Sequence, residues 1–82
     1  VLFYPNPYND ENLNVSYSHH FSELNSIKLF SASGKLLHTT VDKLDVFINH
    51  SVFKELNSGI YFILITNSEG QQINSKLFKR SK

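Results

Sequence analysis

Four histidines are the side chains in this sequence best suited to binding a metal ion. His19 and His20 are neighbours, so on a β-strand their imidazoles point to opposite faces, whereas in a loop both can reach one ion. His38 and His50 are distant from this pair and from each other along the chain. A zinc site needs three or four converging ligands, and no spacing here enforces convergence. The histidines are therefore interpreted as surface loop residues, and no metal site is predicted.

The acidic side chains offer a second kind of chemistry, either calcium binding or acid–base catalysis. Asp10 and Glu11, flanked by Asn9 and Asn12, can supply oxygen ligands to calcium, but the spacing of an EF-hand loop is absent. No serine lies in a G-x-S-x-G pattern, and the chain has no cysteine to act as a nucleophile. The sequence therefore predicts no catalytic residue and no cofactor, and the chain is interpreted as a non-enzyme.

The composition indicates one small domain that folds without disulfides. The chain has 82 residues, of which 40% are hydrophobic and 18% are charged, and it lacks cysteine. Its longest apolar run, 60–65, is much shorter than the roughly 18 residues of a membrane span. Because the sequence also lacks methionine, we expect residues 1–82 to be a single domain excised from a larger precursor.

Positive charge is concentrated near the C-terminus of the chain. The last seven positions hold half of the Lys and Arg residues, namely Lys76, Lys79, Arg80 and Lys82. A basic stripe this short, without aromatic or amphipathic support, is a weak signal for binding to nucleic acid or to a membrane surface. Neither partner is expected.

The elements that position these residues are predicted to be strands. Leu13, Val15 and Tyr17 alternate with polar residues, which is the period of a strand with one buried face. Further strands are predicted at 27–30, 35–41, 46–49, 60–66 and 73–79. The run 60–66 is apolar nearly throughout and is predicted to be a central strand buried on both faces. Only 51–56 competes as a single helical turn, so the sequence predicts an all-β antiparallel sandwich.

Glycine and proline punctuate these strands. Gly34 in "SASGK" and Gly70 in "NSEGQ" can supply the positive φ that a tight hairpin turn requires. In "YPNP", Pro5 has no N–H, and Pro7 pushes Asn6 toward an extended conformation. Such a stiff ribbon belongs on a sheet edge or at the end of a strand, where it also protects against unwanted pairing.

The stretches "YPNP", "LNV", "IKLFSASGK", "LNSGIYFILIT" and "KLFK" occur in this order along almost the whole chain. Together they resemble the type A C-terminal sorting domain of the bacterial type IX secretion system. The resemblance implies an immunoglobulin-like antiparallel β-sandwich of about seven strands. It also implies a non-catalytic secretion signal that directs an N-terminal cargo domain through the outer-membrane translocon of a Gram-negative Bacteroidota species, to the cell surface or the medium.

The resemblance also implies partners for the domain. These are the type IX translocon, its shuttle proteins, and a surface sortase-like peptidase that removes the domain and joins the cargo to an anionic lipopolysaccharide. Any cleavage site is expected to precede Val1.

The motifs of this family fall on identifiable positions of the chain. They are the Pro-x-Pro motif on Pro5, Asn6 and Pro7, the turn on Gly34 and Lys35, L-x-x-G-x-Y on Leu56, Gly59 and Tyr61, and the C-terminal lysine motif on Lys76 and Lys79. Tyr61 resembles the tyrosine corner of Greek-key sandwiches, with its ring in the core and its hydroxyl bonded to nearby backbone. The glycines, Lys35, Leu56 and Tyr61 are therefore expected to be structural.

Recognition is expected at the basic last strand instead. Lys76, Lys79 and Arg80 are predicted to be exposed and to dock onto translocon or shuttle components, together with the segment 5–7. An exposed backbone edge there permits strand addition by a partner. The competing interpretation is that these cations form a solvated edge that discourages aggregation.

Two other classes of function compete with a secretion signal. An accessory module that binds carbohydrate or protein beside an enzyme needs exposed aromatic side chains on one face, and Tyr4, Tyr8 or Phe21 can serve. A small enzyme is the least favoured class, because no catalytic constellation is present.

Overall fold

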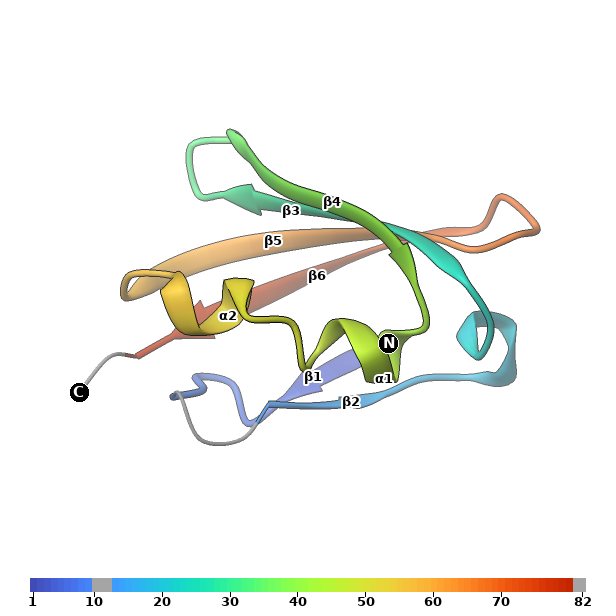
Figure 1. Ribbon diagram of the computed structural model, residues 1–82, viewed down its shortest axis with the longest axis horizontal. Helices are drawn as coiled ribbons and strands as arrows, with labels where there is room; N and C mark the ends of the chain where they lie inside the picture. Colours follow the sequence, from blue (N-terminus) through green and yellow to red (C-terminus); the bar gives the residue numbers. More distant parts are fainter. Residues whose placement is uncertain (10–12, 81–82) are drawn as a thin grey trace.

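The computed structural model describes residues 1–9 and 13–80, which form mainly strands (Figure 1). The described strands are β1 (Leu2–Tyr4), β2 (Asn14–Ser16), β3 (Asn25–Ser31), β4 (Leu36–Asp42), β5 (Gly59–Thr66) and β6 (Gln72–Lys79). The helices are a 3-10 turn η1 (His19–Phe21) and the one-turn helices α1 (Leu44–Phe47) and α2 (Val52–Glu55). None of these described helices has the length and apolar character needed to cross a membrane.

The larger layer is a four-stranded antiparallel sheet in the order β4-β3-β5-β6. Two of its connections are hairpins, in which Gly34 and Gly70 take φ angles of +90° and +83°. A Cβ atom at either glycine would meet nothing within 4 Å, so the backbone conformation, not space, favours glycine. Both predicted hairpin turns are confirmed.

The smaller layer is the antiparallel pair β1-β2, which lies opposite the four-stranded sheet (Figure 1). The helices α1 and α2 connect β4 to β5 on the same side as this pair (Figure 1). The predicted all-β class and the antiparallel sandwich are confirmed, with six strands among the described residues where about seven were expected.

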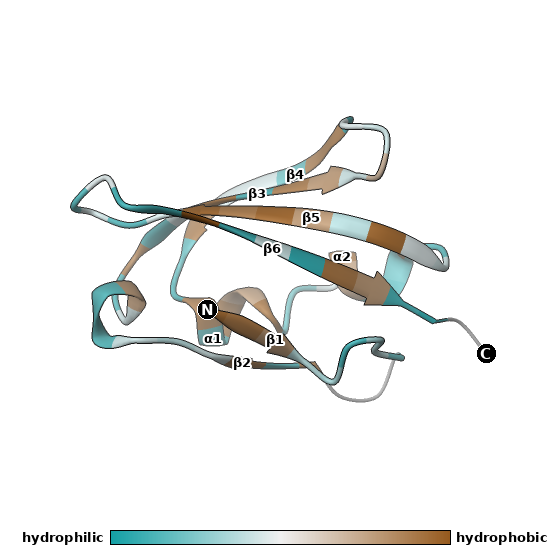
Figure 2. Cartoon of the chain, turned by 180° about the vertical axis from the view of Figure 1, so that it is seen from behind, coloured by the Kyte–Doolittle hydropathy of each residue, from teal (hydrophilic) through white to brown (hydrophobic). Residues whose placement is uncertain are grey.

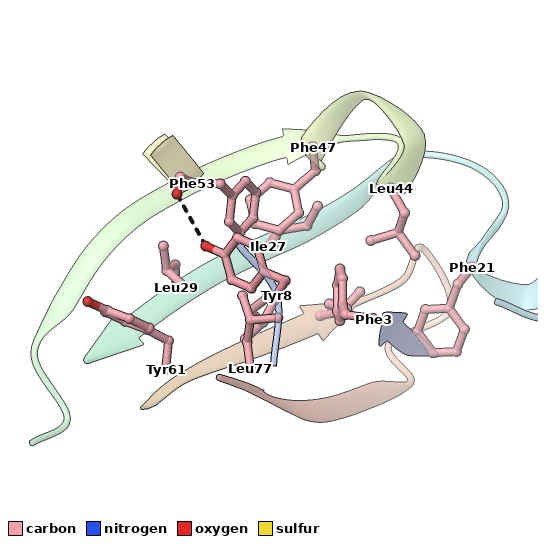
Figure 3. Packing of buried hydrophobic residues seen from close by; sticks show 12 residues of the cluster. Phe3, Tyr8, Phe21, Ile27, Leu29, Leu44, Phe47, Phe53, Tyr61 and Leu77 are labelled. Atoms are coloured by element: carbon pink, nitrogen blue, oxygen red, sulfur yellow. Dashed lines mark hydrogen bonds between the residues drawn. The ribbon is translucent and has the colours of Figure 1, made fainter. Parts of the chain in front are cut away.

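The core lies between the two layers and is lined by side chains from both (Figure 3). Alternate residues of the large sheet point inward, as the period of a strand requires. The buried apolar side chains are Phe3, Tyr8, Phe21, Ile27, Leu29, Leu44, Phe47, Phe53, Tyr61, Ile63, Ile65 and Leu77. Phe47 and Phe53 meet edge to face, with ring centroids 4.9 Å apart. Burial of such side chains contributes about 1.5–3 kcal/mol each and is the main stabilising term.

The prediction of a strand at 46–49 is wrong, because the helix α1 spans Leu44–Phe47. Leu44 and Phe47 are three residues apart, so one helical turn brings both to the core side, while Val46 is exposed. The backbone N–H groups of Val46 and Phe47 both donate to the carbonyl of Lys43. The competing helical turn at 51–56 is confirmed, since α2 spans Val52–Glu55.

The prediction that the run 60–66 is buried on both faces is also wrong. Its central place in the sheet, as β5, is confirmed. Tyr61, Ile63 and Ile65 face the core, but Ile60 and Phe62 are 37% and 38% exposed on the outer face. No described element covers that face, because α1, α2 and the pair β1-β2 all lie on the inner side (Figure 1).

Candidate functional site

Asn6, the middle residue of the Pro-x-Pro motif, pairs with the backbone of β6. Its side-chain amide donates to the carbonyl of Lys76 (3.0 Å), and its oxygen accepts from the N–H of Phe78 (2.8 Å). The two peptide bonds before Pro5 and Pro7 are both cis. The side-chain amide of Asn6 pairs with a carbonyl and an N–H of β6, two backbone groups that would otherwise pair with a neighbouring strand.

Tyr8 continues this pairing two residues further along the chain. Its N–H donates to the carbonyl of Phe78, and its carbonyl accepts from the N–H of Arg80, both at 2.8 Å. Tyr8 and Lys79 therefore form a parallel bridge. The segment 6–8 covers the edge of β6 from 76 to 80, so the expectation that this stretch of edge is exposed for strand addition is wrong. The expected place of "YPNP" at the end of a strand is confirmed, because β1 ends at Tyr4.

The three cations expected to be exposed on the last strand differ in their surroundings. Lys76 and Arg80 are exposed. Lys79 is only 1% exposed, so the expectation that it is an accessible docking residue is wrong. The physical reason is the two-residue period of the strand, which places Lys79 on the same inward face as Leu77.

Lys79 is accommodated in the interior by acceptors on α2. Its ammonium donates to the carbonyls of Phe53 (2.7 Å) and Lys54 (3.2 Å). The Tyr8 hydroxyl donates to the same Phe53 carbonyl (3.2 Å; dashed in Figure 3), and the Tyr8 ring lies 5.9 Å from the ammonium. A helix leaves its last carbonyls without partners inside the helix, and a cation is favourable there. The described contacts of Lys79 make it a structural residue.

Apolar side chains gather on the outer face of the large sheet around Lys76. Strand register places Leu36, Phe30, Phe62 and Lys76 in one row across all four strands. Ile60 and Phe78 form the adjacent pair on β5 and β6, two strands along which hydrophobic stretches show as brown in Figure 2. We call these six residues the outer-face patch. Exposed apolar surface bordered by charge is typical of interaction sites.

The L-x-x-G-x-Y motif builds the entry to β5. The Tyr61 hydroxyl donates to the carbonyl of Asn57 over 2.7 Å, and the ring is buried. Leu56 is partly buried against the core, and Gly59 takes a φ of +154°. This is the geometry expected of a tyrosine corner, with the ring in the core and the hydroxyl bonded to nearby backbone.

The turn residues also have structural surroundings. In the β3-β4 turn, the N–H of Ser31 donates to the carbonyl of Lys35, and the N–H of Lys35 donates to the Ser31 hydroxyl. The N–H of Gly34 donates to the carbonyl of Ser31, which closes the turn. Lys35 itself is exposed and directly precedes β4.

The structure brings together two histidines that the sequence keeps apart. The rings of His38 and His50 lie 4.4 Å apart between centroids, and those of His19 and His20 lie 4.0 Å apart. No group of three or more His, Cys, Asp or Glu side chains suited to a metal ion occurs within residues 1–9 and 13–80. Asp10, Glu11 and Asn12, considered as calcium ligands, lie outside the described residues.

Two of the three aromatic residues suggested for an accessory binding module are buried. Tyr8 and Phe21 belong to the core, so the expectation that they are exposed is wrong. Tyr4 is exposed. A binding face built from these three aromatic residues is therefore not present.

Asn67 is a structural residue that sequence reasoning missed. It is buried before the β5-β6 turn, where its amide donates to the His20 carbonyl (3.0 Å) and to the Gln71 side chain (2.8 Å). Its oxygen accepts from the N–H groups of Glu69 and Gln71. An Asn at the start of a Gly-containing turn is the sequence signal that would have identified this role.

The chain matches the model of a known protein family. Residues 2–80 match the model of the secretion system C-terminal sorting domain, which covers every described strand. No curated protein and no solved structure matches the chain.

Proposed function

We propose a function from the family to which the chain belongs, the secretion system C-terminal sorting domains. Such a domain is a type IX secretion signal and leads to export from Gram-negative Bacteroidota. We propose that this chain acts as a non-catalytic tag that is recognised by its outer sheet face. The observation that carries the proposal is the extent of the family match, which covers all the described strands from β1 to β6. The tag directs an N-terminal cargo domain of the same precursor through the outer-membrane translocon. The cargo is then attached to the cell surface or released.

The proposed recognition surface is the outer-face patch together with Arg80. Lys76 lies beside Phe62 in the strand register, and Arg80 follows the end of β6. Both cations are exposed, in contrast to Lys79. An apolar area that loses water on docking supplies affinity, while the flanking charges supply orientation and specificity. The proposed partners are translocon and shuttle components, and a surface sortase-like peptidase that removes the tag.

The Pro-x-Pro segment has a supporting role in this proposal. Asn6 and Tyr8 hold the end of β6 in place, which fixes the position of Lys76 and Arg80 relative to the sheet. Pro5, Asn6 and Pro7 thus support recognition by positioning the strand that carries these cations.

A secretion assay tests the proposal directly. Residues 1–82 are fused behind a periplasm-directed fluorescent protein in a bacterium that has a type IX system, and surface and medium fluorescence are compared with a translocon-deficient strain. We expect translocon-dependent fluorescence outside the cell. Retention of a folded fusion in the periplasm of both strains contradicts the proposal and favours the accessory-module class, which ligand screening would then examine.

A further inference from the structure

The two edges of the large sheet are protected to different degrees. The edge of β6 is covered from 76 to 80 by the segment 6–8. At the opposite edge, β4 pairs only with β3 among the described residues. Natural sheets protect free edges with proline, charge or bulges. β4 has neither proline nor charge from Leu36 to Val41, and its one register shift is confined to its first residues, before His38.

We infer that β4 is the pairing strand of a symmetric dimer, in which a second copy of this chain adds its own β4 antiparallel to the first. The four-stranded sheet then continues across a twofold axis into an eight-stranded one. The second copy supplies a strand that suits this edge, because β4 is extended, rich in Thr and Leu, and uncharged from Leu36 to Val41.

The ends of β4 are chemically complementary to each other. Lys35 precedes the strand and Asp42 ends it, so antiparallel pairing brings each cation toward the partner's anion. Leu36 at the start and Val41 near the end are 48% and 63% exposed. Antiparallel pairing also brings these apolar side chains together, whereas parallel pairing places each Lys35 beside its copy. A twofold interface requires this kind of self-complementary surface.

Leu36 and Val41 also lie on the same face of the sheet. The register pairs Leu36 with Phe30 and Val41 with Ser26, two residues that share the outer face of β3. Pairing therefore buries apolar side chains as well as backbone groups, and it extends the outer-face patch across the dimer axis.

Both ends of the described chain leave the β4 edge accessible. The Ser75 hydroxyl of β6 donates to the Val1 carbonyl at 3.4 Å, which places the N-terminus beside the opposite edge. Arg80 directly follows β6. A cargo domain that continued from Val1 would leave the molecule on the β6 side, away from the dimer axis.

The expected dimer is weak and depends on concentration. A single added strand buries less surface than a standard stable interface, and each backbone hydrogen bond contributes modestly after exchange with water. We therefore expect monomer at low micromolar concentration and dimer toward millimolar concentration. This inference is independent of the sorting role, because pairing is measured as mass in solution and sorting as export.

Sedimentation equilibrium of the chain, with Val41→Lys and Leu2→Lys variants, tests the inference. Leu2 is 61% exposed in the other layer, which makes it a control matched to Val41 in exposure. We expect the wild type and Leu2→Lys to dimerise alike. Val41→Lys should weaken dimerisation at least tenfold, because the new lysine of each copy then approaches the partner's Lys35. Thr39→Lys, also on the exposed outer side of β4, serves as a second variant if thermal melting shows Val41→Lys to be unfolded.

Hydrogen exchange at two concentrations locates the contact. We expect amides of β4 to exchange more slowly at high concentration, while exchange in β6 stays unchanged. A chain that remains monomeric at millimolar concentration overturns the inference. Dimerisation that persists in folded lysine variants of β4 also overturns the inference, because such a dimer forms through another surface.

Discussion

Lys79, the last residue of β6, donates a hydrogen bond from its buried ammonium to the carbonyl of Phe53 in α2. The same carbonyl accepts from the Tyr8 hydroxyl, so one oxygen joins the last strand and the segment after the Pro-x-Pro motif to the helix. The lysine motif of this chain therefore has two parts with different physical roles. Lys76 is accessible to a partner, whereas Lys79 holds the fold together.

Replacement of Lys79 by Met is expected to destabilise the domain by about 2 kcal/mol, because a hydrogen bond from a charged donor is lost and the Lys54 carbonyl loses this donor. In a chain of this size that corresponds to a fall of about 10 °C in Tm. The control is Lys76→Met on the exposed face of the same strand, which should change stability by less than about 0.5 kcal/mol. Thermal unfolding of both variants measures the difference. Equal stability of the two variants would show that the described contacts of Lys79 contribute nothing net.

Replacement of Asn6 by Ala is expected to cost about 1–2 kcal/mol, since two hydrogen bonds to the backbone of β6 are lost. The sharper readout is amide exchange at Phe78, whose N–H donates to the Asn6 oxygen. This amide should exchange faster in Asn6→Ala and remain protected in Asn74→Ala, which removes an exposed asparagine from the same strand. Unchanged protection of the Phe78 amide in Asn6→Ala contradicts the bridging role.

The strands and turns of this fold could be predicted from local pattern. Alternation at Leu13, Val15 and Tyr17 identified β2, and Gly34 and Gly70 identified the two hairpins, because each signal lies within a few residues. The α1 segment was misassigned because three apolar residues in a row, 46–48, fit a short buried strand as well as a helical turn.

The candidate site was less predictable, because its contacts join distant parts of the chain. Lys79 was expected to be exposed, although the two-residue period of β6 puts it on the same face as Leu77. Its acceptors come from residues 53 and 54, and nothing local indicates them. The two hydrogen bonds between Asn6 and β6 join residues that are 70 and 72 positions apart, so no local pattern indicates them either. Sequence reasoning therefore recognised the motif residues but not which of them are interior.

The Tyr17 hydroxyl provides a test in the alkaline range. It donates to the Asp45 carboxylate over 2.7 Å, and this hydrogen bond, with the negative charges of Asp45 and Glu23, raises the pKa of Tyr17 above 10.0. A raised pKa means that the folded state favours the protonated phenol, so the contribution is complete below the pKa of the unfolded chain and is lost as pH rises through the raised value. Tyr17→Phe should therefore be less stable than wild type at neutral pH, with the difference vanishing at alkaline pH.

Denaturant unfolding of wild type and Tyr17→Phe across this pH range measures the effect. Asp45→Asn is the matched control, because it keeps an acceptor oxygen but removes the charge, and it should lower the pKa of Tyr17 in an ultraviolet phenolate titration. A stability difference that persists unchanged above the raised pKa would contradict the role of this hydrogen bond.

Reversal of the two exposed cations tests the proposed recognition surface in the secretion assay. Lys76→Glu with Arg80→Glu is expected to reduce translocon-dependent export at least tenfold, because the charges that orient docking change sign while the core stays intact. Lys54→Glu, which reverses an exposed lysine on α2, should export like the wild type.

The Lys79→Met variant separates recognition from folding in the same assay. Because Lys79 is buried, its replacement should reduce export only by lowering the folded fraction, so growth at lower temperature should restore export. The doubly reversed variant keeps its fold and should stay defective at every temperature. The contrary outcome is normal export of the doubly reversed variant together with defective export of folded Lys79→Met. That outcome would interchange the roles proposed for the exposed and the buried lysines. The outer-face patch would then not be the surface that the secretion machinery binds.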